Sequence, residues 1–390
     1  MRLLFVGDDA GIQLAKLLVR DEADLIGSIR WRDNRAFFML KAMADSAEVI
    51  IISASDSKLR IFLTNILHLE LNVDLNRIID FYKMYKAILP LMRADCYMKF
   101  DKRDGYKGII LGISHAEVGL LTEYFDENYV NLAVSSQDLY YNNQLLEYVY
   151  TNYYDRVKNV DKLIIDMFDY TYFNYDVSLS STAHSYYGWG GYNKDGHNFE
   201  ENHNYDFSFE EYITYLMCEK YKDISEEMID IWDCCFMNPL KHDQNVIDQC
   251  IPKVWERCSI VSLEDIEQMK IKTSIRVKKF ERTWNENIEI IKRIIGNAYT
   301  YNPRMKIIFL LMPQYYPYLQ KVDSIMGEWK IRFMQEINRY VDNYPIVFWD
   351  YKVSSFSYNK LLFQDPSHLN YYGAFCFTKE LDKRLNRELR

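Results

Sequence analysis

The sequence predicts an α/β protein in which parallel strands alternate with helices. Short apolar runs rich in Ile, Val and Leu recur along the chain, and several are followed by apolar residues at helical spacing. This alternation is typical of βαβ units and a parallel sheet. A chain of 390 residues is long enough for two domains of about 150 residues or more, and the charged segment 99–108 supplies a boundary. We therefore expect one domain at 1–104 and a second at 105–390.

The composition excludes several classes of protein. At 49% hydrophobic and 26% charged residues, the chain is neither disordered nor collagen-like. Lys and Arg number 47 against 56 Asp and Glu, a net charge of −9, which argues against general nucleic-acid binding. No stretch approaches the roughly 20 apolar residues of a membrane span, and the apolar run at the start is too short for a signal-peptide core. The seven cysteines include no CxxC pair, so we expect a cytoplasmic protein without disulfides or a zinc site.

The N-terminal part has predicted strands at 2–6, 25–29 and 49–52. The first strand ends at Gly7, and a helix begins near Gly11, where free N–H groups can hold an anionic group. This arrangement resembles the opening of a Rossmann-like nucleotide- or CoA-binding domain. These two glycines are therefore candidate cofactor-binding residues. Their spacing is not GxGxxG, and Asp8 and Asp9 put negative charge where a pyrophosphate would bind. We favour a Rossmann-like domain without a bound dinucleotide; no cofactor is required, and acetyl-CoA or another acyl donor stays open.

The second part carries residues suited to nucleophilic catalysis. Its apolar runs predict five strands, at 108–113, 129–134, 162–167, 305–311 and 345–349. Ser114 directly follows the first of them, at the edge where parallel sheets bind ligands and where a helix start supplies N–H groups. Asp365 and His368 stand three residues apart near the end of the chain. A neutral imidazole can activate a serine hydroxyl, and a carboxylate can orient that imidazole. The alternatives are that Ser114 only caps a helix and that His368 is a cap or core histidine. The presence of Ser114, Asp365 and His368 in this order favours catalysis.

These features resemble the SGNH (GDSL-like) hydrolase and acyltransferase superfamily: an early Gly-x-Ser after the first of five strands, then a late Asp-x-x-His followed by Leu-Asn-x-x-Gly. The resemblance implies a flavodoxin-like three-layer α/β/α domain. It also implies that Ser114 is the nucleophile, His368 its general base and Asp365 the residue that orients the histidine. The backbone N–H groups of Ser114 and Ser136 would bind the oxyanion.

Three positions depart from the family pattern. Ile113 replaces the aspartate of Gly-Asp-Ser, and Ser136 stands where a glycine is usual. The third motif, usually Gly-x-Asn-Asp, corresponds to 166–169 and has no asparagine, so a side-chain oxyanion donor is missing or comes from elsewhere. This pattern is similar to divergent members that modify cell-surface polysaccharides. A catalytically decayed binding or scaffold protein is one alternative, and a nucleotide-sugar or CoA binder working through the N-terminal domain is another.

A large insertion at 170–300 separates the third and fourth strands. Its first part is rich in Gly, Asn and Tyr, and Tyr187, Trp189 and Tyr192 are candidates for stacking on sugar rings, with ordinary loop packing as the alternative. Its histidines, at 184, 197 and 203, match no common metal spacing. The rest predicts helices at 208–222, 225–237 and 262–299. The last fits either a cover over the active-site edge or a dimer arm, which leaves a homo-oligomer open.

Together these features predict a serine-dependent esterase or O-acyl(acetyl)transferase that works through an acyl-enzyme. The family resemblance and the aromatic segment favour a carbohydrate or glycan as substrate, in the biosynthesis of a surface polysaccharide.

Overall fold

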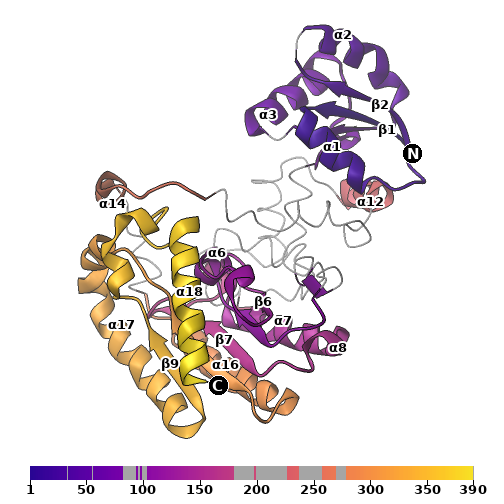
Figure 1. The fold of residues 1–390 in the computed structure, drawn as a ribbon. Helices are drawn as coiled ribbons and strands as arrows, with labels where there is room; N and C mark the ends of the chain where they lie inside the picture. The colour runs from indigo at the N-terminus through magenta and orange to yellow at the C-terminus, as the bar shows by residue number, and fades with distance from the viewer. Residues whose placement is uncertain are drawn as a thin grey trace. The chain divides into compact units, whose positions relative to one another are not determined.

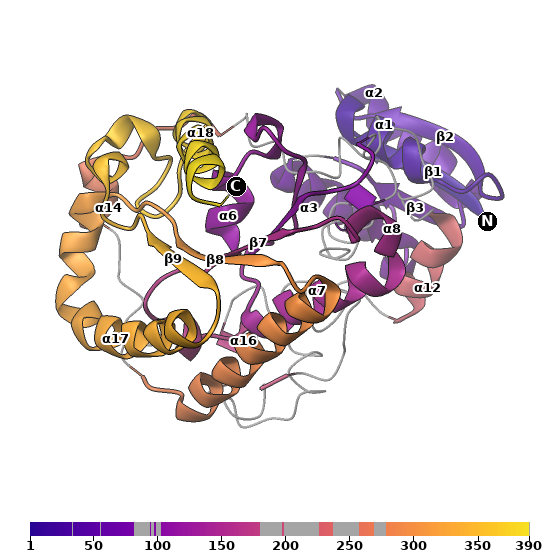
Figure 2. The same ribbon diagram turned by 60° about the horizontal axis from the view of Figure 1, so that its bottom comes forward.

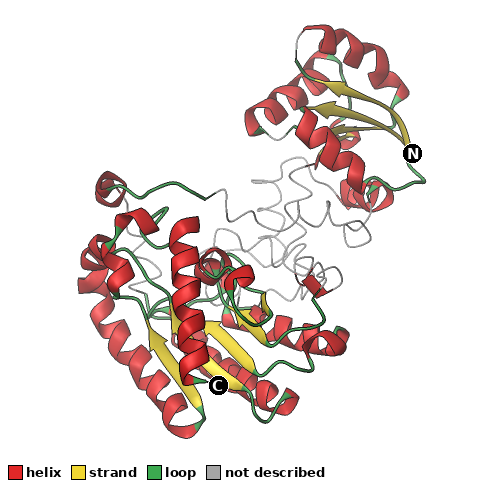
Figure 3. Cartoon of the chain, viewed as in Figure 1, coloured by secondary structure: helices red, strands yellow, loops and turns green. Residues whose placement is uncertain are grey.

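Two parallel β-sheets, each flanked by helices, make up the computed structural model of the chain (Figures 1 and 3). The structure describes residues 1–32, 34–54, 56–81, 94, 97–98, 103–179, 197–198, 226–236, 257–268 and 278–389. The chain divides into two compact units, one holding the four-stranded sheet and the other the five-stranded sheet. The predicted α/β class, with a Rossmann-like part followed by a flavodoxin-like part, is confirmed.

The first unit is a four-stranded parallel sheet in the order β2-β1-β3-β4. Its strands are β1 (Arg2–Gly7), β2 (Asp24–Arg30), β3 (Val49–Ile52) and β4 (Ile78–Asp80). Its helices include α1 (Asp9–Leu18), α2 (Asn34–Met43) and α3 (Ser57–Asn65). Alternate residues of β1 face opposite sides: Leu3 and Phe5 pack toward α1, Leu4 and Val6 toward α2 and α3. The three predicted strands are present; β4 was not predicted, because three residues are too few to show a period.

Helix α12 (Glu226–Cys235) completes the core of this first unit. Trp232 and Phe236 are buried, and the Phe236 ring stacks on Phe5 of β1 at 6.4 Å. The backbone N–H of Arg20 donates to the carbonyl of Cys235 at 2.8 Å. The predicted helix at 225–237 is therefore present. It packs in the first unit, whereas the expected division at residue 104 assigned it to the insertion of the second domain. Its apolar side, with residues three and four apart, covers a sheet face that α1 leaves open.

The second unit contains the five predicted strands, all parallel, in the order β6-β5-β7-β8-β9. They are β5 (Gly108–Leu111), β6 (Tyr129–Asn131), β7 (Lys162–Asp166), β8 (Lys306–Leu311) and β9 (Ile346–Asp350). This order places the topological switch point, where such sheets bind ligands, between β5 and β7. Ser114 follows β5, so the fold puts the predicted nucleophile at that point.

Helices cover both faces of the five-stranded sheet (Figure 2). They are α6 (Ser114–Gly119), α7 (Leu139–Asn152), α8 (Tyr154–Val157), α14 (Leu263–Gln268), α16 (Glu281–Tyr301), α17 (Tyr316–Asn343) and α18 (Tyr371–Glu388). Helices α6 and α18 pack on one face, and α7, α16 and α17 lie on the other. Within the described ranges, no helix combines the length and apolar character that crossing a bilayer demands.

The predicted continuous helix over 262–299 is wrong. Helix α14 ends at Gln268, and residues 278–280 are not helical before α16 begins. The side chain of Asn174 explains the break: its Nδ2 donates to the Lys278 carbonyl at 3.0 Å, and its Oδ1 accepts from the Phe280 N–H at 2.8 Å. These bonds hold the backbone groups that a helix would use. The helix predicted at 208–222 lies outside the described residues.

Candidate active site

A tight turn places Ser114 at the first position of α6, directly after β5. Gly112 makes this turn with a φ of +148°, and a Cβ there would lie 2.5 Å from the Cβ of Asp166. The glycine of the Gly-x-Ser motif is therefore required both by its backbone conformation and by the close approach of β7. The turn delivers the serine hydroxyl to the carboxyl edge of the sheet.

The structure brings the three predicted catalytic residues into one hydrogen-bonded line. Ser114 Oγ lies 2.8 Å from His368 Nε2. On the other side of the ring, His368 Nδ1 lies 2.9 Å and 3.0 Å from the two carboxylate oxygens of Asp365. A carboxylate only accepts hydrogen bonds, so Nδ1 carries the proton and Nε2 is free to accept from the serine hydroxyl. The distance between Ser114 Oγ and His368 Nε2 lies within the range for proton transfer to a general base.

Asp365 is held in its ionised form. Burial raises the pKa of this carboxyl, but the hydrogen bond and charge of His368 outweigh it and lower the pKa to about 2. The backbone N–H groups of Ser367 and His368 also donate to Asp365 Oδ1, each at 2.9 Å. The carboxylate is thus charged at neutral pH and fixed in direction, as the orienting member of a triad must be.

The Leu-Asn-x-x-Gly segment after His368 fixes the loop that carries the histidine. Phe363 and Leu369 form an antiparallel bridge across the base of this loop. Asn370 caps α18 by accepting from the Gly373 N–H at 2.9 Å. A Cβ on Gly373 would lie 2.0 Å from the Leu362 carbonyl oxygen, so only glycine lets the helix pack against the loop. The motif is therefore explained by packing around the catalytic loop.

Ser114 and Ser136, the predicted oxyanion donors, follow neighbouring strands. The first residue of a helix has no partner for its N–H within the helix, which suits Ser114. Ser136 lies after β6 with a φ of +63°, a left-handed conformation that glycine prefers, which explains the glycine usual at this position. The adjacent Ser135 donates to Glu117 of α6, and Tyr175 donates to the Ser136 carbonyl at 2.8 Å. The first bond ties the loop that carries Ser136 to the helix that begins at Ser114, and the second ties it to the segment after β7.

The third-motif segment anchors α6 and contributes an aromatic ring. Asp166 is buried, and its carboxylate accepts from the N–H groups of Ala116 at 3.0 Å and Phe168 at 2.9 Å. Burial outweighs these hydrogen bonds and raises the pKa of Asp166 to about 7. Phe168, the residue that aligns in sequence with the asparagine of the SGNH pattern, has a φ of +57°. Its ring packs on His115 at 5.1 Å, so this segment carries a ring where that pattern has an amide.

Sequence reasoning missed His115, which adjoins the triad. Its ring stacks on that of His368, with 4.6 Å between centroids and 13° between planes. Burial, and then the charge of His368, lowers the pKa of His115 well below its ordinary value, so this ring is neutral. The only sequence signal for His115 is its position next to Ser114. That position does not distinguish a histidine of the site from an ordinary core histidine.

The two N-terminal glycines have structural roles. A Cβ on Gly7 would lie 2.5 Å from the backbone of Ser53, so the packing of β1 against β3 requires this glycine. The N–H of Gly11 donates to the Asp8 carboxylate at 2.8 Å. The chain's own carboxylate therefore occupies the helix amide that a bound phosphate would use.

The candidate sugar-stacking residues Tyr187, Trp189 and Tyr192 lie outside the described residues, as do the histidines at 184 and 203. The ring of His197, which is described, stacks on Tyr140 at 3.7 Å, and its Nε2 lies 3.7 Å from Glu286. In the part of the chain that the structure describes, no three His, Cys, Asp or Glu side chains gather in a way that could hold a metal ion.

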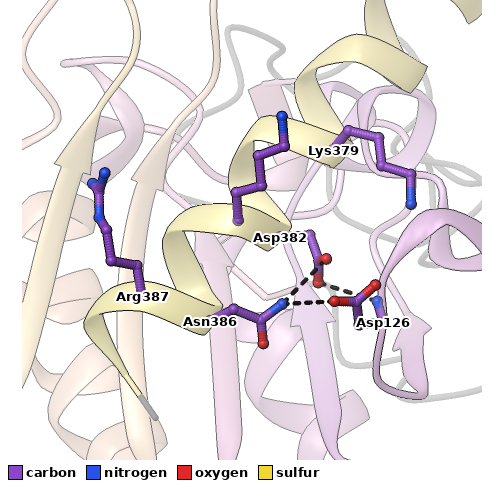
Figure 4. Close-up of a pocket in the computed structure, with 6 residues that line it drawn as sticks. Asp126, Lys379, Asp382, Asn386 and Arg387 are labelled. Atoms are coloured by element: carbon purple, nitrogen blue, oxygen red, sulfur yellow. Dashed lines mark hydrogen bonds between the residues drawn. The ribbon is translucent and has the colours of Figure 1, made fainter.

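A surface pocket of about 490 Å³ lies at the opposite edge of the same unit (Figure 4). Its lining residues are Asp126, Lys379, Asp382, Lys383, Asn386 and Arg387. Asp126 precedes β6, whereas Ser114 follows β5, so the pocket is at the amino edge of the sheet. Asn386 Nδ2 donates to Asp126 at 3.0 Å and to Asp382 at 3.3 Å. These bonds fasten the last turns of α18 and have no link to the triad.

Comparison with known proteins adds little to this geometry. No protein-family model and no curated protein matches the sequence. Among solved structures, the chain is similar to a protein from Streptococcus pneumonia that is provisionally described as a platelet activating factor. The TM-score is 0.35 and the identity 13%, over 85% of this chain and 100% of that one. A likeness at this level carries no argument about fold or function, which therefore rest on the residues themselves.

Proposed function

We propose that the chain is a serine-dependent acyl-transfer enzyme of the SGNH type, an esterase or an O-acyltransferase. The observation that carries this proposal is the line from Ser114 Oγ to His368 Nε2, at 2.8 Å, and from His368 Nδ1 to Asp365, at 2.9 Å. Ser114 is far from Asp365 and His368 in the sequence, and the three residues meet at the carboxyl edge of the sheet. A scaffold protein has no need to preserve this geometry, which argues against a decayed site.

In the first half of the reaction, Ser114 Oγ attacks the acyl carbonyl while His368 Nε2 takes the hydroxyl proton. The carbonyl π electrons move to the oxygen, and the N–H groups of Ser114 and Ser136 donate to the resulting oxyanion. When the tetrahedral intermediate collapses, the bond to the leaving group breaks and His368 returns the proton to it. The ionised Asp365 stabilises the imidazolium throughout. The product is an ester between the acyl group and Ser114.

In the second half, an acceptor hydroxyl attacks the acyl-enzyme and His368 takes its proton. Collapse of the second tetrahedral intermediate breaks the bond to Ser114 Oγ, which recovers the proton from His368. The reaction is hydrolysis if the acceptor is water and acyl transfer if it is a sugar hydroxyl. Because the third motif supplies a phenyl ring rather than an amide, both oxyanion donors in this proposal are backbone groups.

We further propose that the substrate is a carbohydrate that carries or receives an acetyl group, in the cytoplasmic biosynthesis of a surface glycan. The support is the resemblance of the motifs to polysaccharide-modifying members of the superfamily and the aromatic segment 178–206 in the sequence. Flat aromatic rings in such a segment suit contacts with the faces of sugar rings.

A fluorophosphonate probe tests the proposed chemistry without knowledge of the substrate, because it labels only an activated serine. We expect the wild-type chain to be labelled on Ser114, and both Ser114→Ala and His368→Ala to abolish labelling. Brief incubation with p-nitrophenyl acetate should add one acetyl group to the same serine, detected by mass spectrometry of the intact protein. A folded wild-type chain that neither reagent modifies would show that the site is catalytically decayed.

A further inference from the structure

His115 contacts two other rings at the proposed active site. It stacks on His368, with centroids 4.6 Å apart and planes 13° apart, and it packs against Phe168 at 5.1 Å and 34°. The His115 side chain is 3% exposed, whereas Phe168 and His368 are half-buried. The buried ring thus connects Phe168 to the imidazole that contacts Ser114.

Among the described residues, the specific contacts of the His115 side chain are those of its ring with neighbouring rings. Neither of its nitrogens has a hydrogen-bond partner among the described residues, although both are buried. A buried histidine is ordinarily held by a hydrogen bond from at least one nitrogen. Whatever His115 does for the neighbouring histidine, it therefore does through the face of its ring.

Burial keeps the His115 ring neutral, and the charges around it do not reverse this. Burial has the largest effect on its pKa, and the positive groups His368 and Lys352 lower it further; the carboxylates of Asp169 and Asp365 oppose this without reversing it. A neutral aromatic face attracts an adjacent cation, whereas a second cation would repel it. His368 can thus gain a proton beside His115 without a like-charge penalty.

We propose that His115 is a positioning residue that acts through its ring face. It holds the His368 ring in the plane that directs Nε2 to Ser114 and Nδ1 to Asp365, and it stabilises the imidazolium formed when the serine proton is transferred. This inference rests on the proposed function, because it requires His368 to alternate between its neutral and charged forms. Phe168, from the segment 166–169, also contacts the His115 ring.

Two substitutions at one position separate this role from simple core filling. His115→Leu fills the space without a ring face, whereas His115→Phe keeps the face. We measure the rate of fluorophosphonate labelling of the full chain from pH 5 to 9. The leucine variant should be labelled about tenfold more slowly, since small misplacements of a catalytic group have large effects on rate. The acid midpoint of its rate profile should move about 0.5 to 1 pH unit lower, because the imidazolium loses its aromatic neighbour.

The phenylalanine variant should rescue most of the lost rate and restore the acid midpoint. Phe5→Leu, a buried aromatic substitution in the core of the first unit, is the matched control and should leave the midpoint in place. Phe168→Leu should shift rate and midpoint in the same direction as His115→Leu, to a smaller extent, and it keeps the test valid if His115→Leu does not fold.

Each outcome has a separate meaning. An unlabelled wild-type chain would defeat the proposed function itself. A labelled wild type, together with a folded leucine variant that matches it in rate and midpoint, would overturn only the role of His115. Equal losses in the leucine and phenylalanine variants would also overturn it, because the ring face would then not be what His368 requires.

Discussion

Substituting Asp365 with asparagine tests the proposed triad at the group that sets the protonation of His368. Asp365 Oδ1 accepts from the backbone N–H groups of Ser367 and His368, each at 2.9 Å. In Asp365→Asn these two donors would hold the amide oxygen, which turns the NH₂ group toward His368 Nδ1. That nitrogen would then have to accept a hydrogen bond, so the ring proton would move to Nε2. A protonated Nε2 cannot take the proton of Ser114.

The expected loss of activity follows from this change of tautomer. A histidine held in the wrong tautomer costs up to about 10⁴-fold in rate, equivalent to about 5.5 kcal/mol of activation free energy. Stability should change much less. The lowered pKa of Asp365, about 2 against an ordinary 3.8, corresponds to at most about 2.5 kcal/mol. Because its side chain is 44% exposed, solvent screening reduces this to about 1 kcal/mol. A lowered native pKa stabilises above about pH 4, and this stabilisation is lost as the pH falls toward 2.

The assay is the rate of fluorophosphonate labelling at pH 8, with the free energy of unfolding measured in urea on the same preparations. Ser367→Ala is the matched control: it removes the hydroxyl that donates to Asp365 at 3.2 Å but keeps the carboxylate, so its rate should stay within about fivefold of wild type. If Asp365→Asn were labelled within tenfold of the wild-type rate while Ser114→Ala remained unlabelled, Asp365 would not orient the base.

Four further predictions concern stability. Gly112→Ala should lower the free energy of unfolding by about 2–4 kcal/mol in urea titrations, because the new Cβ meets Asp166 and φ is +148°. Ser136→Gly should raise it by about 1 kcal/mol by relieving a positive φ; no increase would mean that the loop tolerates the serine without strain. His115→Phe should raise the thermal midpoint, because it removes two buried nitrogens without partners among the described residues. Burial raises the pKa of Asp138 from 3.8 to about 7. The contribution of Asp138 to the free energy of unfolding should therefore fall as the pH rises from about 4 to about 7. In Asp138→Asn, unfolding free energies at pH 5 and pH 8 should accordingly differ less than in wild type.

Local patterns were enough to predict eight of the nine described strands and the residues of the proposed triad. Runs such as 49–52 and 307–311 are short, continuously apolar and rich in Ile, which favours a buried strand, and the structure has a strand at each. Asp365 and His368 are three residues apart, so their proximity is local. The meeting with Ser114 followed from topology, because residues that follow the strands of a parallel sheet gather at one edge.

Long-range contacts determined what the sequence did not show. Whether the stretch before α16 is helical depends on Asn174, more than a hundred residues away, whose side chain binds the backbone of Lys278 and Phe280. Helix α12 has an apolar side that would suit either unit, and its contacts with residues such as Phe5 and Arg20 identify the one it joins. Periodicity reports that a residue is buried but not what it is buried against.

The segment 166–169 connects the backbone of β7 to His368, the proposed catalytic base. Asp166, at the end of that strand, accepts from Ala116 and Phe168, so one carboxylate holds both the helix that begins at Ser114 and the turn that carries the phenyl ring. That ring contacts His115, which contacts His368. An asparagine at residue 168 could donate to an oxyanion but would offer no aromatic face to His115. If the His115 stack positions His368, Phe168→Asn should slow fluorophosphonate labelling, although it introduces the asparagine of the SGNH pattern. A faster rate would contradict this, because it would show that a missing oxyanion donor limits the rate more than the loss of the ring does.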